Sequence, residues 1–274
     1  MKRNDRFIFI CGPCVIESEG LLDEVAGFLK ETLARVPAWD FYFKASFDKA
    51  NRSAHDSFRG PGLERGLKML SGIKKKFGVK VLTDVHLPEH CGPAAETVDA
   101  LQIPAFLCRQ TDLVIEAATQ AAKNGKSLNI KKGQFLAPWD MGNVIEKVES
   151  TTNQKRPPWL WLTERGTSFG YNNLVVDMTS FPIMRKLGVP VLFDATHSVQ
   201  LPGGAQGGKV TGGRREMIEP LARAATAAGI DGIFMETHPR PAEAKSDAAN
   251  AFPLTELPRF IESIERIREL EHIS

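Results

Sequence analysis

Eight short apolar runs recur along this chain, and stretches with helical periodicity lie between them. The runs cover residues 7–10, 41–43, 79–82, 100–103, 127–130, 159–162, 189–193 and 232–235, and the helical stretches cover 21–35, 63–77, 112–123, 143–149, 179–186, 216–228 and 257–270. Strands that alternate with helices predict parallel strand–helix–strand units. Eight such strands close most simply into a single (β/α)8 TIM barrel of the α/β class, which we predict as the fold.

A doubly wound open sheet is the alternative for the same alternation. A dinucleotide-binding sheet of that kind carries Gly-x-Gly-x-x-Gly after a strand, and that motif follows none of the predicted strands. No stretch has the composition of a linker, so residues 1–274 are predicted to form one barrel domain. The Gly-rich segment 202–213 is predicted to be a mobile loop at the mouth of this barrel.

The overall composition excludes several classes of protein. The chain has 274 residues with 42% hydrophobic and 25% charged residues, which is ordinary for a globular protein. Because 35 basic residues nearly balance 33 acidic ones, the net charge of +2 does not indicate a nucleic-acid partner. No apolar run approaches the roughly 18 residues of a membrane span, and no signal-peptide core opens the chain. We therefore expect a cytoplasmic protein with neither a nucleic-acid nor a membrane partner.

Chemically reactive side chains follow every predicted strand. In chain order they are Cys14, Lys44 with Ser46, Asp84 with His86, Arg109, Lys131 with Lys132, Glu164 with Arg165, Asp194 with His197, and Glu236 with His238. Barrel enzymes assemble their active sites at the carboxyl ends of the strands. The pattern therefore predicts a catalytic mouth at that end of the barrel.

Cations are concentrated among these strand-end residues and in the loop over residues 43–53. They are Lys44, Lys49, Arg52, Arg109, Lys131 and Arg165. Ammonium and guanidinium groups make strong hydrogen bonds to phosphate and carboxylate oxygens. In a nearly neutral chain, such a cluster focuses positive potential on a substrate with several negative groups. A solvated turn with ordinary surface lysines is the alternative interpretation of the 43–53 loop alone.

A second set of residues has the chemistry of a metal site. Cys14, His197 and Glu236 each follow a strand, and Asp247 lies in a later loop. A thiolate, an imidazole and two carboxylates suit Zn²⁺ or Fe²⁺ better than Mg²⁺ or Ca²⁺. Other histidines compete as ligands, namely His55, His86, His90 and His238. A buried free thiol is the alternative role for Cys14.

Cys11 and Cys14 also form a C-x-x-C motif after a strand, with Gly-Pro between them as in thioredoxin-type sites. Ile10 precedes the motif where thioredoxins usually carry Trp, and the chain is more than twice as long as a thioredoxin domain. The redox site is therefore the weaker interpretation of these cysteines.

Several long sequence words occur in a fixed order. They are KASFDKANRS at 44–53, SFRGPGL at 57–63, QIPAFLCRQTD at 102–112, KKGQFLAP at 131–138, TERGTSFGYNNLVVD at 163–177 and DATHSVQLPGG at 194–204. With these words the chain resembles the 3-deoxy-D-manno-octulosonate 8-phosphate synthases, from about residue 7 to residue 267. The resemblance implies a (β/α)8 barrel that assembles as a homotetramer.

The resemblance also implies a reaction. These enzymes condense phosphoenolpyruvate with D-arabinose 5-phosphate and water, and they release an eight-carbon sugar acid phosphate and inorganic phosphate. The product enters the inner core of lipopolysaccharide, which implies the cytoplasm of a bacterium of the Gram-negative type. Two phosphorylated substrates account for the surplus of cations.

By the same resemblance, substrate roles are assigned to individual residues. Lys131 and Arg165 would bind the phosphate of phosphoenolpyruvate, and Lys44, Ser46 and Lys49 would face its carboxylate and reacting carbons. On the sugar side, Arg52 and Ser53 would hold the phosphate, with Asn51 nearer the sugar and with Asp84 and His86 near its hydroxyls or aldehyde. Arg109 would reach the sugar phosphate bound by a neighbouring subunit.

The family has a metal-dependent form with Cys after Gly-Pro and a metal-independent form with Asn there. Gly12-Pro13-Cys14 resembles the metal-dependent form, and His197, Glu236 and Asp247 match its remaining ligands. The implied ion is Zn²⁺ or Fe²⁺, with Mn²⁺, Co²⁺ or Cd²⁺ as alternatives. Lys44, Lys49, His197 and Asp247 are the predicted catalytic residues, and the general base is left open between His197, Asp247 and a substrate phosphate oxygen.

Two other functions are weighed against this one. The related synthase that uses erythrose 4-phosphate shares the barrel and the metal set, but it normally carries Lys-Pro-Arg-Thr-Ser where residues 49–53 read KANRS. A silent sugar-phosphate-binding protein would not need a complete set of metal ligands and phosphoenolpyruvate cations. The eight-carbon synthase is therefore the preferred prediction.

Overall fold

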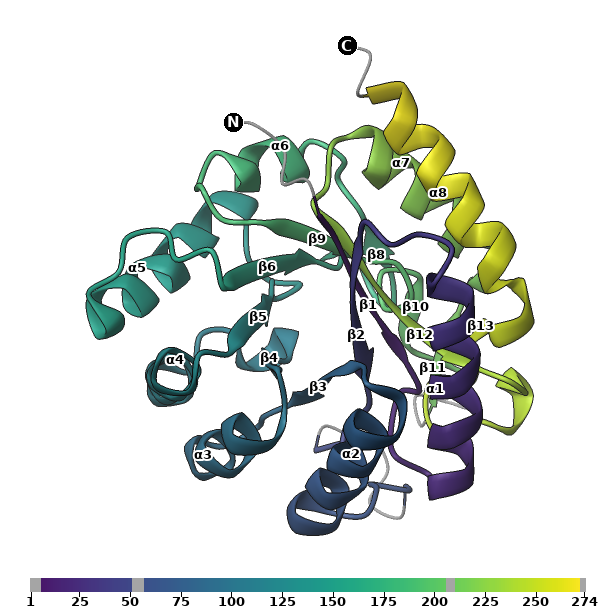
Figure 1. Ribbon diagram of the computed structural model, residues 1–274. Coiled ribbons are helices and arrows are strands. Elements are labelled where there is room, and N and C mark those ends of the chain that lie inside the picture. Colours follow the sequence, from purple (N-terminus) through teal and green to yellow (C-terminus); the bar gives the residue numbers. More distant parts are fainter. Residues whose placement is uncertain (1–5, 51–56, 206–209, 272–274) are drawn as a thin grey trace.

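The computed structural model of this protein describes residues 6–50, 57–205 and 210–271. Its main sheet contains β1 (Phe7–Gly12), β2 (Trp39–Lys44), β3 (Lys80–Asp84), β4 (Ala100–Ile103), β5 (Ser127–Lys131), β6 (Leu160–Glu164), β9 (Val191–Asp194) and β12 (Gly232–His238). Each strand pairs in parallel with the next, and β12 pairs back with β1. The eight strands thus close into a barrel with helices around it, as predicted (Figure 1).

Helices surround the barrel, and all but one of those in the described residues overlap stretches predicted to be helical. They are α1 (Glu19–Leu33), α2 (Leu63–Phe77), α3 (Pro88–Thr97), α4 (Thr111–Asn124), α5 (Met141–Thr152), α6 (Ser180–Arg185), α7 (Ile218–Ala227) and α8 (Leu257–Glu271). Short 3-10 turns occur at η1 (Ala105–Leu107), η2 (Pro138–Asp140), η4 (Arg215–Met217), η5 (Pro241–Glu243) and η6 (Leu254–Glu256). In the described part of the chain, no helix combines the length and apolar character needed to cross a membrane.

Sequence periodicity missed α3. Pro88 suits the first turn of a helix, where the backbone N–H has no intrahelical partner, but Pro93 lies in the interior and removes one hydrogen bond. The apolar stripe is also short, with only Cys91, Ala94 and Ala95 buried. Packing of α3 against α2 and α4 therefore outweighs its weak intrinsic helix signal.

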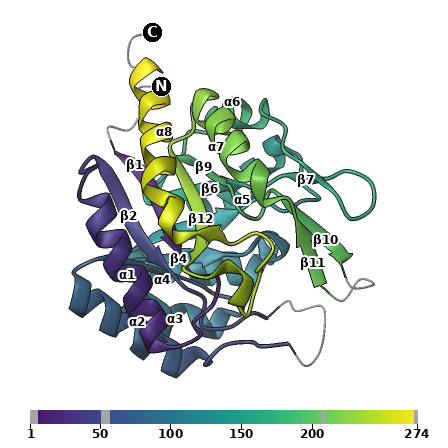
Figure 2. The same cartoon turned by 90° about the vertical axis from the view of Figure 1, so that its right-hand side faces the viewer.

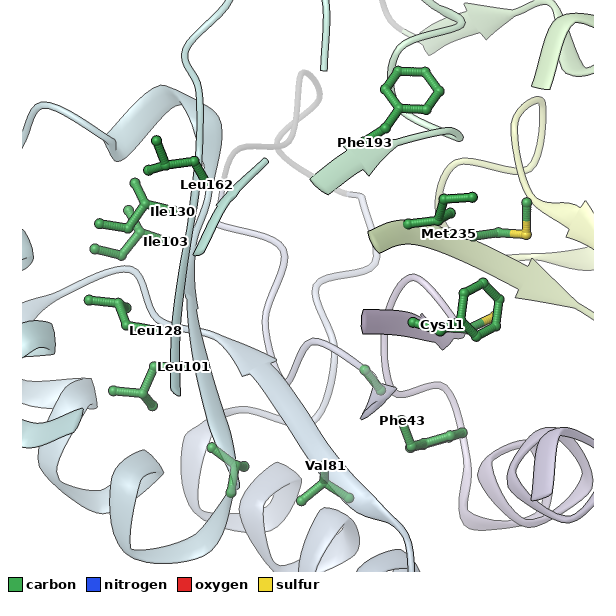
Figure 3. Close-up of a cluster of buried hydrophobic side chains, with 14 of the residues drawn as sticks. Cys11, Phe43, Val81, Leu101, Ile103, Leu128, Ile130, Leu162, Phe193 and Met235 are labelled. Atoms are coloured by element: carbon green, nitrogen blue, oxygen red, sulfur yellow. The ribbon is translucent and has the colours of Figure 1, made fainter. Parts of the chain in front are cut away.

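Alternation along the strands divides the core into two layers. In β1, Phe7, Phe9 and Cys11 belong to the outer layer between strands and helices, whereas Ile8 and Ile10 point into the barrel. Figure 3 shows part of the outer layer, with Leu101, Leu128 and Ile130 among its labelled side chains. The inner layer contains Ile8, Ile10, Tyr42, Leu82, Ala100, Trp161, Leu192 and Phe234.

The segment predicted to be a mobile loop at residues 202–213 instead contains paired strands. β10 (Gln200–Ala205) pairs antiparallel with β11 (Val210–Gly213), and Figure 2 shows this hairpin projecting beyond the barrel strands. Gly213 packs so closely on Asn250 that a Cβ atom there would lie 1.7 Å from the Asn250 Oδ1 atom. A smaller hairpin joins β7 (Thr167–Ser168) and β8 (Leu174–Val175), and β13 (Phe252–Pro253) extends the sheet beside β12.

Candidate active site

Three of the four predicted metal ligands meet at one point at the carboxyl ends of the strands. Cys14 lies just after β1, Glu236 lies in β12, and Asp247 lies in the loop between β12 and β13. Their ligand atoms all lie within 4.8 Å of one another, and the Cys14 Sγ atom is 3.1 Å from the Asp247 Oδ2 atom. Barrel closure therefore brings together residues from the two ends of the chain.

The fourth predicted ligand, His197, faces the same cluster from the loop after β9. Its Nε2 atom is 3.4 Å from Glu236 Oε2 and 3.9 Å from Asp247 Oδ2. Its Nδ1 atom is 2.8 Å from the Oδ2 atom of Asp194, the last residue of β9. A carboxylate behind an imidazole fixes the ring and is the usual arrangement behind a metal-binding histidine.

The negative charge gathered around Cys14 suits a divalent cation. Burial raises the pKa of the Cys14 thiol well above its ordinary value, and the nearby Glu236 carboxylate raises it further. A divalent cation stabilises the thiolate and compensates the negative charge gathered around it. Cys14, His197, Glu236 and Asp247 together supply the sulfur, nitrogen and oxygen donors that such an ion takes.

Burial of both thiols disfavours the thioredoxin-type interpretation of Cys11 and Cys14. Both thiols are free and buried, and burial raises the pKa of each. Cys11 packs in the outer hydrophobic layer, whereas Cys14 contacts Asp247 and Ser246 at the mouth. A reactive redox cysteine instead requires a lowered pKa and access to solvent.

Two lysines from the second strand and its loop lie against the predicted ligands. The Lys44 Nζ atom, at the end of β2, is 2.6 Å from Glu236 Oε1 and 2.8 Å from the carbonyl oxygen of Cys14. The Lys49 Nζ atom is 3.6 Å from Asp247 Oδ2. Burial alone would lower the pKa of Lys49, but Cys14, Glu236 and Asp247 raise it well above its usual range.

Lys131 and Arg165 form the opposite side of the mouth, at the ends of β5 and β6. The Lys131 Nζ atom is 2.6 Å from Asp194 Oδ2 and 3.3 Å from the centre of the Phe234 ring. One Arg165 nitrogen donates at 2.9 Å to both the carbonyl oxygen of His197 and the Gln200 side chain. Because both cations are buried, their pKa values fall below the ordinary ones, which indicates groups that gain from an anionic ligand.

A ladder of hydrogen bonds links the neighbouring strands β3, β4, β5 and β6 along the wall of the barrel. Ser46 donates to Asp84, Gln102 Nε2 donates to Asp84 Oδ1 at 2.6 Å, Asn129 Nδ2 donates to Gln102 Oε1 at 2.8 Å, and Thr163 Oγ1 donates to Asn129 Oδ1 at 2.7 Å. Gln102, Asn129 and Thr163 are fully buried, and sequence reasoning missed them. Their signal was present as polar residues inside otherwise apolar strands.

Many of the predicted site residues line one small cavity of about 60 Å³ at the mouth, although Cys14, Ser46 and Asp247 are not part of its lining. It is lined by Lys44, Asp48, Lys49, Asp84, His86, Pro104, Ala105, Phe106, Lys131, Arg165, His197 and Glu236. A larger hollow of about 890 Å³ lies between α1 and α2 on the outside of the barrel and contains none of the predicted site residues. The predicted site residues therefore gather at the smaller cavity and not at the larger hollow.

Some predicted residues are not brought to this cavity. Arg109 is exposed at the turn before α4, where its carbonyl oxygen accepts a hydrogen bond from Lys147 at 3.5 Å. The residues Asn51, Arg52, Ser53 and His55 lie outside the described part of the chain.

The competing histidines stand apart from the ligand cluster. His86 lines the cavity and packs edge-on against Phe47, and its pKa falls because it is buried. His90 also packs on Phe47. His238 is buried, with its Nε2 atom 3.8 Å from Glu17.

A parallel barrel with buried cations and a thiol–carboxylate cluster at its mouth defines the chain as a (β/α)8 enzyme built for anionic substrates. Within that class the chain belongs to the DAHP synthetase I family, whose model matches residues 2–271.

Curated relatives extend this assignment. A protein of Fusobacterium nucleatum subsp. nucleatum is 57% identical over 252 residues, which span 92% of this chain and 87% of the relative. A protein of Trichlorobacter lovleyi is 54% identical over 260 residues, which span 95% of this chain and 92% of the relative. A protein of Francisella tularensis subsp. holarctica is 52% identical over 267 residues, which span 97% of this chain and 92% of the relative. All three are named 2-dehydro-3-deoxyphosphooctonate aldolase, which confirms the family resemblance drawn from the sequence words.

Proposed function

We propose that this chain condenses phosphoenolpyruvate with D-arabinose 5-phosphate and water to give 3-deoxy-D-manno-octulosonate 8-phosphate and inorganic phosphate. The names of the relatives support this reaction, because 2-dehydro-3-deoxyphosphooctonate is the same eight-carbon compound. The same names disfavour the seven-carbon synthase that uses erythrose 4-phosphate. We assign the activity to one catalytic domain over residues 1–274, acting in the cytoplasm on phosphorylated metabolites.

The observation that carries this proposal is the gathering of four cations around one cavity, three of them buried and Lys49 largely buried. Lys44, Lys49, Lys131 and Arg165 come from three different strand ends and line the same space. We assign the phosphate of phosphoenolpyruvate to Lys131 and Arg165, and its carboxylate and reacting carbons to Lys44, Ser46 and Lys49. Such an arrangement neutralises the repulsion between two polyanions and aligns them, and positioning of this kind removes several kcal/mol from a barrier.

The sugar phosphate is assigned to the neighbouring side of the mouth. We assign Asp84 and His86 to the sugar hydroxyls or aldehyde, and Asn51, Arg52 and Ser53 to the phosphate end. The exposed position of Arg109 supports a role toward a neighbouring subunit rather than its own cavity.

We propose that the chain assembles as a homotetramer. Exposed apolar side chains at Phe135, Trp139, Phe169 and Tyr171 support assembly. Light scattering tests the oligomeric state.

We propose that Cys14, His197, Glu236 and Asp247 hold a divalent cation, Zn²⁺ or Fe²⁺, with Mn²⁺, Co²⁺ or Cd²⁺ as replacements. The donor set and its burial support this choice. When bound, such an ion supplies Lewis-acid polarisation of an oxygen atom at the mouth. Asp194 holds the imidazole of His197 in the orientation that this role requires.

The bond changes follow from the assigned positions. A bond forms between C3 of phosphoenolpyruvate and the aldehyde carbon of the sugar, whose oxygen takes up a proton and becomes a hydroxyl. Water adds at C2 and loses a proton, and the resulting hemiketal phosphate expels inorganic phosphate by cleavage of the C2–oxygen bond. His197, Asp247 and a substrate phosphate oxygen are the candidate bases for the water, and Lys44 and Lys49 stabilise the negative charge beside the reacting carbons.

The test is release of inorganic phosphate from phosphoenolpyruvate in the presence of each aldose phosphate. We expect arabinose 5-phosphate to support rapid release and erythrose 4-phosphate to support little. Preference for erythrose 4-phosphate would replace the eight-carbon assignment by the seven-carbon one. No release with either sugar, from protein reloaded with metal, would overturn the synthase assignment and leave a binding protein.

A further inference from the structure

Glu17 is a carboxylate outside the ligand cluster that links the segments carrying the predicted metal ligands. It lies three residues after Cys14, in the stretch between β1 and α1. This stretch is held firmly, because Val15 forms a β-bridge with Ser46 and the Ile16 N–H donates to the Ser46 carbonyl oxygen at 3.0 Å. Glu17 therefore projects from a fixed support.

The Glu17 side chain reaches the loop that carries Asp247. The backbone N–H of Lys245, two residues before Asp247, donates to Glu17 Oε1 at 2.9 Å. Asp247 has a φ angle of +51°, in the left-handed region that non-glycine residues adopt at a cost of roughly 1–3 kcal/mol. Such a conformation persists only where the surrounding contacts hold it. The hydrogen bond from Lys245 to Glu17 is one of those contacts.

A third segment meets the same carboxylate. His238 is the last residue of β12, the strand that also carries Glu236, and its Nε2 atom lies 3.8 Å from Glu17 Oε1. Its Nδ1 atom accepts the N–H of Arg240 at 3.0 Å, which holds the ring with Nε2 on the side of Glu17. The strand of Glu236, the loop of Asp247 and the segment of Cys14 thus converge on Glu17.

We propose that Glu17 is a positioning residue for the metal site, which fixes the Asp247 loop relative to Cys14 through the N–H of Lys245. The inference rests on the metal site that forms part of the proposed function. Without the carboxylate, the Lys245 N–H loses its acceptor and the Asp247 loop relaxes from its strained conformation. The four donors are then no longer held at the separation that a cation needs. Loss of supporting contacts of this kind typically costs 10–100-fold in metal affinity.

The experiment compares the affinity of the metal-free protein for Co²⁺ in three variants. Glu17→Ala removes the acceptor, and we expect Co²⁺ to bind about 10–100-fold more weakly, with a weakened thiolate-to-cobalt absorption band. Glu17→Gln keeps an oxygen that accepts the Lys245 N–H, and we expect affinity close to that of the original protein. Glu24→Ala is the matched control, because Glu24 pairs with Arg240 at 3.3 Å on the exposed surface and touches neither Lys245 nor Asp247.

The melting temperature of the metal-free protein separates positioning from general support of the fold. We expect Glu17→Ala to leave it close to the original value, because this value does not depend on assembly of the cation site. If Glu17→Ala does not fold, Glu17→Asp takes its place in the experiment. The shorter side chain keeps the negative charge but no longer reaches the N–H of Lys245. We again expect weaker Co²⁺ binding. Unchanged Co²⁺ affinity in Glu17→Ala, or in Glu17→Asp, overturns the proposal, as does a loss in Glu24→Ala that equals the loss in Glu17→Ala.

The outcome is distinguishable from failure of the proposed reaction, because Co²⁺ affinity is measured without substrates. Original protein that binds Co²⁺ but releases no phosphate from phosphoenolpyruvate overturns the reaction and leaves the role of Glu17 to be decided by the variants. Original protein that binds no Co²⁺ overturns the metal site and the role of Glu17 together.

Discussion

The Lys44 ammonium and the Glu236 carboxylate form an ion pair of 2.6 Å inside the mouth of the barrel, where both side chains are almost fully buried. The second oxygen of the same carboxylate, Oε2, lies 3.4 Å from His197 Nε2. Burial alone would lower the pKa of Lys44, but Glu236 and Asp84 raise it above its ordinary value. One carboxylate therefore joins the cationic pocket to the predicted metal ligands, and it keeps the lysine charged.

Replacing Lys44 by methionine is expected to remove activity and to destabilise the protein by about 3–5 kcal/mol, because Glu236 and Asp84 are left buried without their cation. Denaturant unfolding of the metal-free protein measures the stability. The control is Lys80→Met, since Lys80 pairs with Asp40 at the surface and such pairs contribute less than about 1 kcal/mol. Equal effects of the two replacements would contradict the importance of the buried pair.

Chelation is expected to inactivate the enzyme, and Zn²⁺ or Fe²⁺ is expected to restore it when metals are added back one at a time. The reason is that the thiol, the imidazole and the two carboxylates form one set of sulfur, nitrogen and oxygen donors, which we propose holds the ion. Phosphate release before and after dialysis against a chelator measures the effect. Full activity in the chelator would remove the metal from the mechanism and leave the synthase assignment intact.

Cys14→Asn is the control for that experiment. The metal-independent form of the family carries Asn at this position, so we expect the variant to keep some activity and to be insensitive to chelation. A variant that still requires added metal would show that the remaining three ligands suffice to hold the ion.

The barrel could be predicted because its strands and helices are each marked by a pattern within a short stretch of sequence. Each strand is a short apolar run, most of the helices carry an amphipathic stripe, and the predicted helix over residues 63–77 coincides with α2 at both ends. The hairpin of β10 and β11 could not be read in the same way. Its glycines resemble those of a loop, and the strands are defined only by backbone pairing, as between Gln200 and Gly213 and between Leu201 and Gly212.

The site was predictable where a charged residue ends a strand and unpredictable where a polar residue lies within one. Lys44 and Lys131 were found because charge at the carboxyl end of a barrel strand indicates function. Gln102 and Asn129 were missed because they interrupt apolar runs and acquire a role only through hydrogen-bond partners on the neighbouring strands. Glu17 was missed for a related reason, since its partner Lys245 lies 228 residues away in the sequence.

Asp84 makes the stability of the metal-free protein depend on pH. Burial alone would raise its pKa, but Lys44 and Lys131 lower it below the ordinary value of 3.8. A carboxylate with a lowered pKa in the folded state stabilises the fold above the unfolded-state pKa and loses that contribution as the pH falls through the folded-state value. We therefore expect unfolding free energy to fall on acidification below about pH 4.

Asp84→Asn tests this origin. The difference in unfolding free energy between the original protein and the variant should be constant above about pH 5 and should shrink as the pH falls below 3.8. Denaturant titrations over a series of pH values measure it, with Asp23→Asn as the control, because Asp23 pairs with Lys76 at the exposed surface. A difference that stays constant down to pH 2 would assign the acid sensitivity to other groups.

Gln200 connects the two halves of the site through a single amide. Its Oε1 atom accepts from Arg165 at 2.9 Å, and its Nε2 atom donates to Asp247 Oδ1 at 3.0 Å. A hydrogen bond to a charged group contributes about 1.5–3 kcal/mol. Gln200→Ala is therefore expected to raise the KM for phosphoenolpyruvate and to weaken Co²⁺ binding, each by roughly tenfold or more, because both charged partners lose their orientation.

Gln200→Glu separates the effect on the KM for phosphoenolpyruvate from the effect on Co²⁺ binding. The carboxylate still accepts from Arg165, but it replaces the donor that faces Asp247 by a second negative charge, so it should disturb the orientation of Asp247 while the Arg165 contact persists. Steady-state kinetics with phosphoenolpyruvate and Co²⁺ competition against a chelator measure the two sides separately. Gln154→Ala is the control, since Gln154 bonds Trp159 on the exposed surface. If Gln200→Ala changes only one of the two quantities, the amide orients a single partner and the two halves of the site are independent.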